Sequence, residues 1–188
     1  VRIGLNLAAV MNSAGDADKA LSLAEENLAL ARKAGHLSNI AAGLVASGLV
    51  HLILGEWEKS EKCLEESWSI AEKSKDFQQM ELSMVFFGLL YFSRGEYSKA
   101  VEWFEKLDVL LERARAEKDL YIHGFSVWLV SAYIELGQTE KAEHRIDFLQ
   151  KLALEMPGEE LTAAANTLKA MALRARKKWD ESIKLFEK

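Results

Sequence analysis

The chain has 188 residues, of which 49% are hydrophobic and 28% are charged, and its formal net charge is −5. This composition predicts a folded domain rather than a disordered chain. The acidic and basic residues are interspersed, so no basic block indicates nucleic-acid binding. The single Cys63 excludes an internal disulfide and fits a reducing compartment, so we expect a cytoplasmic protein.

Helices are favoured throughout, because Pro157 is the only proline and Ala, Leu, Glu and Lys predominate. No run of about 18 apolar residues predicts a membrane span. The first 15 residues resemble a signal peptide superficially, with Arg2 before an apolar run. Their apolar residues have helical spacing in register with the segments that follow, so we interpret them as part of the fold.

A segment of about 40 residues repeats along the chain, and each copy has a turn residue between two helical patterns. The turn residues recur at intervals of 40, 40, 42 and 40, at Gly15, Gly55, Gly95, Gly137 and Lys177. The period predicts an all-α fold, a solenoid of about five antiparallel helix pairs in a single domain over 1–188. We expect repeats at about 1–35, 36–76, 77–119, 120–157 and 159–188, the last of them incomplete.

The second helix of repeat one follows Gly15 and has an apolar face formed by Leu21, Ala24, Leu28 and Ala31. Asp16 is a suitable N-cap for this helix. Gly35 is a suitable residue for the left-handed position after its end. The sequence therefore predicts both ends of this helix.

Repeats two and three are the clearest copies, since 48–68 reads GLVHLILGEWEKSEKCLEESW and 88–108 reads GLLYFSRGEYSKAVEWFEKLD. Gly48 has no Cβ, so the two helices of repeat two are expected to approach closely there. Trp57 and Trp68 have helical spacing with other apolar residues, and we expect both in the core.

Repeats four and five follow the pattern less closely. Val130 replaces the small residue of the Gly48 position, and we expect the two extra residues of repeat four in its second helix or the following loop. Repeat five has Trp179, Ser182 and Phe186 at the expected positions but no capping helix after it. The chain also begins without Met, so we expect a piece of a longer protein.

The residues FGLLYFSRGEYSKAVEWF at 87–104 carry a resemblance to the tetratricopeptide repeat, with its aromatic residues, turn glycine and following Ala and Phe. The present repeats exceed the usual length of about 34 residues. They resemble the extended subclass found in kinesin light chains, in polarity scaffolds of the Gly-Leu-Asn type and in sensor regions of maltose-regulator-type activators. The resemblance implies a right-handed superhelix whose concave face is lined by the first helix of each repeat.

The resemblance also implies which residues line a partner-binding groove. They are Val45, Leu49, Leu52, Val85, Leu89, Phe92, Val127, Ser131 and Ile134. Most of them are apolar, so an apolar or amphipathic segment of a partner protein is the expected ligand. Val45, Leu49, Val85 and Leu89 can equally be covered by neighbouring helices, whereas Leu52, Phe92 and Ile134 favour the groove.

Catalytic and cofactor motifs are absent from the sequence. The four histidines lack the i+3 or i+4 spacing of a metal site, and no Cys-x-x-Cys motif, phosphate loop or nucleophile elbow is present. We expect His51 in the core and His36 at a helix start. Neither Cys63 nor the adjacent acidic pairs suggest catalysis. We therefore expect no catalytic residues, no metal and no cofactor, and a protein that is not an enzyme.

The sequence thus predicts a protein–protein interaction module, a scaffold or adaptor that holds a partner peptide or helix in an apolar groove. The alternative is a ligand- or peptide-sensing regulatory domain of a multidomain signalling or transcription-regulatory protein. An exposed apolar groove can also support self-association.

Overall fold

The computed structural model describes residues 16–114, 122–155, 159–178 and 181–182, and in these residues the regular structure is entirely helical. The predicted fold class, an all-α solenoid of helix pairs, is confirmed. The helices are α2 (Ala17–Ala34), α3 (Leu37–Ile53), α4 (Trp57–Ser74), α5 (Phe77–Ser93), α6 (Tyr97–Ala114), the 3-10 helix η1 (Ile122–Phe125), α7 (Ser126–Glu135), α8 (Thr139–Glu155) and α9 (Glu159–Ala175).

Caps and left-handed residues set the helix ends. The Asp16 carboxylate accepts a hydrogen bond from the Lys19 amide, and the Asp76 carboxylate does the same for Gln79 at the start of α5. Gly35 ends α2 with a φ of 71°, a left-handed conformation that costs glycine little. The predicted N-cap and the predicted residue after the helix are both confirmed.

The predicted turn residues have the same backbone conformation. Gly55, Gly95 and Gly137 have φ angles of 72°, 75° and 69°, and Lys177 has the same sign at 60°. Lys177 therefore replaces a turn glycine in geometry as well as in sequence position. Gly15 and residues 1–14 lie outside the described residues, as do Trp179 and Phe186.

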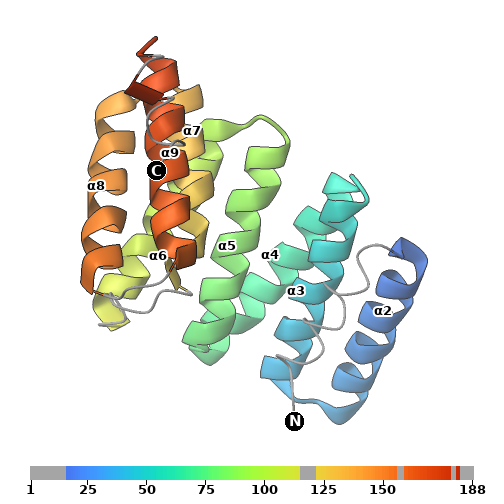
Figure 1. Ribbon diagram of the computed structural model, residues 1–188. Helices are drawn as coiled ribbons and strands as arrows, with labels where there is room; N and C mark the ends of the chain where they lie inside the picture. The colour runs from blue at the N-terminus through green and yellow to red at the C-terminus, as the bar shows by residue number, and fades with distance from the viewer. Residues whose placement is uncertain (1–15, 115–121, 156–158, 179–180, 183–188) are drawn as a thin grey trace. The chain divides into compact units, whose positions relative to one another are not determined.

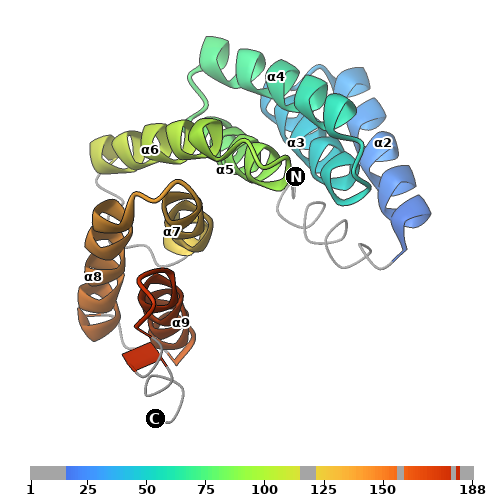
Figure 2. The same ribbon diagram turned by 90° about the horizontal axis from the view of Figure 1, so that it is seen from above.

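The chain divides into two compact parts, Val1–Arg94 and Gly95–Lys188, which we call the N-terminal part and the C-terminal part. In the N-terminal part, α2 to α5 follow one another in alternating directions (Figure 1). Helix α3 packs against α2, α4 and α5 (Figures 1 and 2). Ala20, Ala24, Ala46 and Val50 form a buried cluster between α2 and α3. The predicted single domain over 1–188 stays a prediction.

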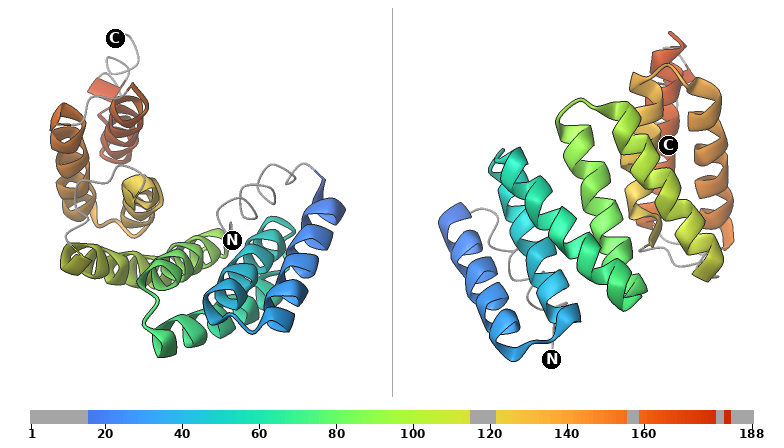
Figure 3. Two further views of the ribbon diagram at one scale, coloured as in Figure 1. Left: turned by 90° about the horizontal axis from the view of Figure 1, so that it is seen from below. Right: turned by 180° about the vertical axis from the view of Figure 1, so that it is seen from behind.

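In the C-terminal part, α7 has the central position that α3 has in the N-terminal part. It packs against α6, α8, α9 and η1, and α8 packs against α9 (Figure 3). Helix α8 begins two residues after Gly137, just as α4 begins two residues after Gly55. The two extra residues of repeat four therefore precede Gly137, so their predicted place in the second helix or the following loop was wrong.

Arg145 on α8 holds several elements of the C-terminal part together. Its guanidinium lies 5.2 Å from the ring centroid of Phe125 and 5.1 Å from that of Phe148. The same group donates to Ser126 Oγ at 2.8 Å and pairs with Asp108 at 2.9 Å. Since Asp108 lies on α6 and Ser126 on α7, one side chain connects three helices.

Small residues let the two helices of a repeat approach, as predicted for repeat two. A Cβ built on Gly48 would lie 3.2 Å from the Leu64 side chain, closer than an ordinary contact. Ser60 on α4 donates to the Gly48 carbonyl at 2.8 Å. The equivalent residue of repeat five, Ser182, donates to the Ala170 carbonyl at 3.1 Å.

Candidate functional site

The candidate site is the apolar surface of the first helices of the repeats, α3, α5 and α7. Helix α3 contains no Asp, Glu, Lys or Arg, and α5 contains only Glu81. By contrast, α4 contains eight such residues. Charged side chains strongly favour water, so the first helices have faces for packing or binding and the second helices have faces for solvent.

Most of the apolar surface of α3 is used for packing within the N-terminal part. All residues from 41 to 50 are buried, and Val45 and Leu49 are only 1% and 7% exposed. Burial of this degree favours the packing interpretation for these two residues. Leu52, one turn later, is half-buried and keeps part of its side chain accessible.

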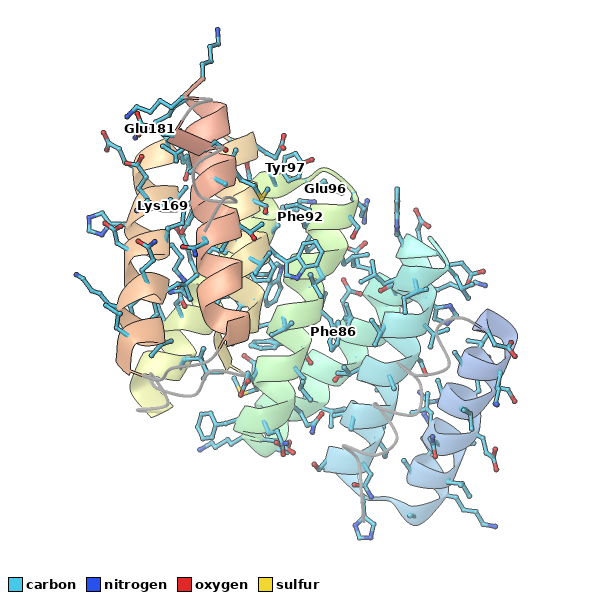
Figure 4. All side chains as sticks on the ribbon, viewed as in Figure 1. Phe86, Phe92, Glu96, Tyr97, Lys169 and Glu181 are labelled. Atoms are coloured by element: carbon cyan, nitrogen blue, oxygen red, sulfur yellow. The ribbon has the colours of Figure 1, made fainter. Side chains whose placement is uncertain are left out.

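Helix α5 has an accessible apolar stripe. Val85, Leu89 and Phe92 are half-buried and have the i, i+4, i+7 spacing of one helix face. Figure 4 labels Phe92 near the end of α5 and Phe86 further down the same helix. Phe86 is 7% exposed and belongs to the packed side. Because α3 and α5 pack against each other, Leu52 and this stripe lie on neighbouring helices.

Helix α7 has a similar stripe in the C-terminal part. Val127, Ser131 and Ile134 are half-buried, again at i, i+4 and i+7. The Ser131 hydroxyl donates to the Val127 carbonyl at 2.8 Å within the same helix. Its donor is therefore already used, and the stripe offers less polar character than its sequence indicates.

Tyrosines anchor α5 and α7 to the preceding second helix. The Tyr91 hydroxyl donates to Glu61 at 2.6 Å, and Tyr133 donates to Glu105 at 2.9 Å. Burial first, and then the bond to the Glu105 carboxylate, raise the pKa of Tyr133 well above its ordinary value. The sequence predicts both tyrosines as repeat residues. It does not predict their partners, because Glu61 and Glu105 occupy different positions in their repeats.

The remaining polar candidates have structural surroundings. His51 is 13% exposed in its side chain, and its Nδ1 lies 2.7 Å from Glu56 Oε2. His36 precedes α3, is exposed and makes no side-chain cap. Burial raises the pKa of the half-buried Cys63 thiol, and Glu66 adds to the effect, so the reactive thiolate is disfavoured.

Trp57 differs from its predicted place in the core. Its side chain is 37% exposed, together with Ile53 at 48% and Leu54 at 40% in the adjoining turn. The reason is its position as the first residue of α4, where the chain has just left the packed end of α3. Trp68, deeper in α4, is half-buried.

Metal-ion clusters and membrane-spanning helices are both missing from the described residues. No group of three or more His, Cys, Asp and Glu residues there could hold a metal ion. No helix in the same part of the chain has both the length and the apolar character to cross a membrane.

Comparisons with known proteins agree with this architecture. Residues 2–73 match the tetratricopeptide repeat family model. No curated protein matches the chain at a significant level. Two solved structures have a similar fold over nearly the whole chain, although their low sequence identities limit the likeness to the fold.

The first is a crystal structure of the nearly identical TPR-like repeats of a Podosopora anserina protein assigned as a kinesin light chain. It has a TM-score of 0.76 and 18% identity, over 99% of this chain and 92% of that one. The second is BtubC (BKLC) from P. vanneervenii, with a TM-score of 0.71 and 14% identity, over 100% of this chain and 72% of that one. The predicted resemblance to the tetratricopeptide repeat is therefore confirmed, by sequence over residues 2–73 and by fold over the helix pairs.

Proposed function

We propose that this chain is a protein-interaction module that binds an apolar or amphipathic segment of a partner protein on the accessible faces of its first helices. The observation that carries the proposal is the stripe of Val85, Leu89 and Phe92 on α5. These side chains keep part of their surface exposed on a helix that has a single charged residue, Glu81. The tetratricopeptide repeats support it, because repeat solenoids generally serve as interaction scaffolds.

The spacing of the stripe indicates the kind of ligand. An amphipathic helix presents side chains at i, i+3, i+4 and i+7, and a face with the same spacing can receive them. Phe92 is the suitable anchor, since aromatic residues dominate the binding free energy of many interfaces. In the C-terminal part, Val127 and Ile134 offer a second face of the same type.

The proposed contact residues are fewer than the sequence predicts. Val45 and Leu49 are left out because their side chains are buried. The remaining positions are all half-buried: Leu52, Val85, Leu89, Phe92, Val127, Ser131 and Ile134. The free Cys63 fits a reducing compartment, so a cytoplasmic location is part of the proposal.

The test is affinity capture with the wild-type chain and with a Leu52→Glu/Phe92→Glu double variant. A carboxylate placed on either position would have to be desolvated when an apolar ligand binds. We expect the double variant to keep its helicity in circular dichroism and to lose the partner. Concentration-dependent light scattering on the same two proteins shows whether the partner is a second copy of the chain.

A matched control places the same change on second helices. Leu30 and Val109 are 58% and 47% exposed on α2 and α6, so Leu30→Glu/Val109→Glu has equal chemistry away from the proposed faces. We expect this control to retain every partner. A folded Leu52→Glu/Phe92→Glu variant that also retains every partner would contradict the proposal.

A further inference from the structure

Two ion pairs occupy the same position in different repeats. Arg94 Nη1 lies 2.8 Å from Glu61 Oε2 in the N-terminal part, and Arg176 Nη2 lies 2.9 Å from Glu143 Oε2 in the C-terminal part. Both arginines directly precede a turn residue, and both glutamates follow a turn glycine by six residues. Each pair therefore joins the second helix of one repeat to the end of the first helix of the next.

The boundary between these two ionic boundaries has apolar residues at both positions. Val101 follows Gly95 by six residues, and Leu136 directly precedes Gly137. Helices α6 and α7 pack together, Val101 is 6% exposed and Leu136 is half-buried. Both members of the ionic pair are thus replaced together.

The first boundary is apolar as well, with Leu21 six residues after Gly15 and Leu54 directly before Gly55. Along the chain the boundaries therefore alternate: Leu21 with Leu54, Glu61 with Arg94, Val101 with Leu136, and Glu143 with Arg176. None of these four boundaries combines a charged residue with an apolar one. The two positions change as a pair rather than independently.

A mixed boundary would be unfavourable for a clear physical reason. The side chains of Glu61 and Arg94 are only 26% and 25% exposed, and Tyr91 also donates to Glu61 at 2.6 Å. A leucine in place of Arg94 would leave a partly buried carboxylate without its cation. Removing one partner of such a pair is more harmful than replacing both by apolar groups.

We propose that these two positions form a matching code between consecutive repeats, in which a second helix with Glu accepts only a following first helix that ends in Arg, and an apolar one accepts only an apolar one. The code alternates with a period of two repeats. It prevents neighbouring repeats from exchanging places, since every single-step exchange would pair a charged residue with an apolar one. Arg94 and Arg176 act as positioning residues in this code.

The test is a double-mutant cycle in the full chain, followed by urea unfolding and by hydrogen exchange of α4 and α5. Arg94→Leu and Glu61→Val each create a mixed boundary, and Glu61→Val/Arg94→Leu recreates the apolar boundary found at Val101 and Leu136. We expect each single variant to raise the equilibrium constant of unfolding by on the order of tenfold. We expect the double variant to return to within roughly threefold of the wild type.

Two further measurements make the outcome decisive. A repeat of the cycle in a Tyr91→Phe background removes the hydroxyl that shares Glu61, so that only the pairing of the two positions is measured. The Glu143→Val/Arg176→Leu cycle tests the second ionic boundary, where the side chains are 42% and 35% exposed and smaller changes are expected. If a single variant fails to fold while the double variant folds, the code is supported. Additive losses at both boundaries would overturn it.

Discussion

The contact between α4 and α5 in the N-terminal part and the contact between α6 and α7 in the C-terminal part have equivalent positions but different chemistry. Ser67 and Ser83 occupy the centre of the first contact, and Leu107 and Phe125 occupy the same positions 40 and 42 residues later. Ser67 Oγ lies 3.1 Å from Ser83 Oγ and donates to the Ala41 carbonyl at 2.9 Å. The side chains at all four of these positions are less than 5% exposed.

The comparison shows that one helix arrangement can be stabilised in two ways. A buried hydrogen bond contributes about 1 kcal/mol net, whereas burial of a phenylalanine or leucine side chain contributes about 1.5–3 kcal/mol. The serine contact is directional and has little volume, so it should be sensitive to enlargement. The Leu107–Phe125 contact derives its stability from volume, so it should be sensitive to truncation.

The largest expected effect is therefore that of Phe125→Ala. Phe125 is 4% exposed, its ring stacks on Phe104 with centroids 5.6 Å apart, and the Arg145 guanidinium covers it. Removal of the ring leaves a cavity, and we expect a loss of about 3–5 kcal/mol. Hydrogen exchange of the α6 and α7 amides measures the loss locally, which is preferable because two compact parts need not unfold together.

Phe148→Ala is the matched control for this change. Phe148 also contacts the Arg145 guanidinium, at 5.1 Å, but its side chain is 37% exposed. We expect the control to cost about 1 kcal/mol, because most of the loss at Phe125 comes from buried volume. Equal losses at the two positions would mean that the contact with Arg145, and not packing, is what stabilises this region.

An intermediate effect is expected from Ser67→Leu, which places the residue of the second contact into the first. Ser67 is fully buried beside another serine, so the additional carbon atoms have no space. We expect a loss of about 1–3 kcal/mol from overpacking, and the orphaned Ser83 hydroxyl adds to it. Urea unfolding compared with Ser22→Leu, an exposed position on α2, measures it.

The Ser67→Leu/Ser83→Ala double variant sharpens the result. Alanine creates space and removes the orphaned hydroxyl, so we expect partial recovery relative to Ser67→Leu alone. If Ser67→Leu is as stable as the wild type, the two contacts are interchangeable and the difference between them has no energetic meaning.

The repeat architecture could be predicted from the sequence because the repeated features are local. Turn glycines, caps such as Asp16 and the small residue at Gly48 each depend on backbone conformation within one helix pair. Even Lys177, a residue that disfavours the left-handed region, was placed correctly from its interval of 40 residues alone. Periodicity therefore compensated for an unfavourable residue type.

The candidate site was less predictable, because exposure depends on packing between repeats. Val45 and Leu89 occupy the same kind of apolar position in sequence, but Val45 is buried and Leu89 is half-buried. The Tyr91–Glu61 and Arg145–Asp108 contacts join residues 30 and 37 positions apart. Such pairings depend on how one repeat is placed on the next, which a pattern within a single repeat does not contain.

The smallest expected effect concerns the backbone geometry that both regions share. Lys75 ends α4 with a φ of 56°, and Lys177 has a φ of 60° at the turn after α9. A non-glycine residue loses about 1–2 kcal/mol in this region, while glycine costs about 0.5–1 kcal/mol more conformational entropy on folding. We therefore expect Lys75→Gly and Lys177→Gly each to raise the free energy of unfolding by about 0.5 kcal/mol.

The reverse change at Gly55 provides the control. Nothing lies within 4 Å of a Cβ built there, so Gly55→Ala should lose about 1 kcal/mol from backbone conformation alone. Thermal unfolding of the three variants compares them directly. Equal gains at Lys75 and Lys177 would mean that the turns are independent of whether the adjoining contacts are polar or apolar. A gain at only one of them would mean that side-chain chemistry between repeats also sets the strain of the backbone that connects them.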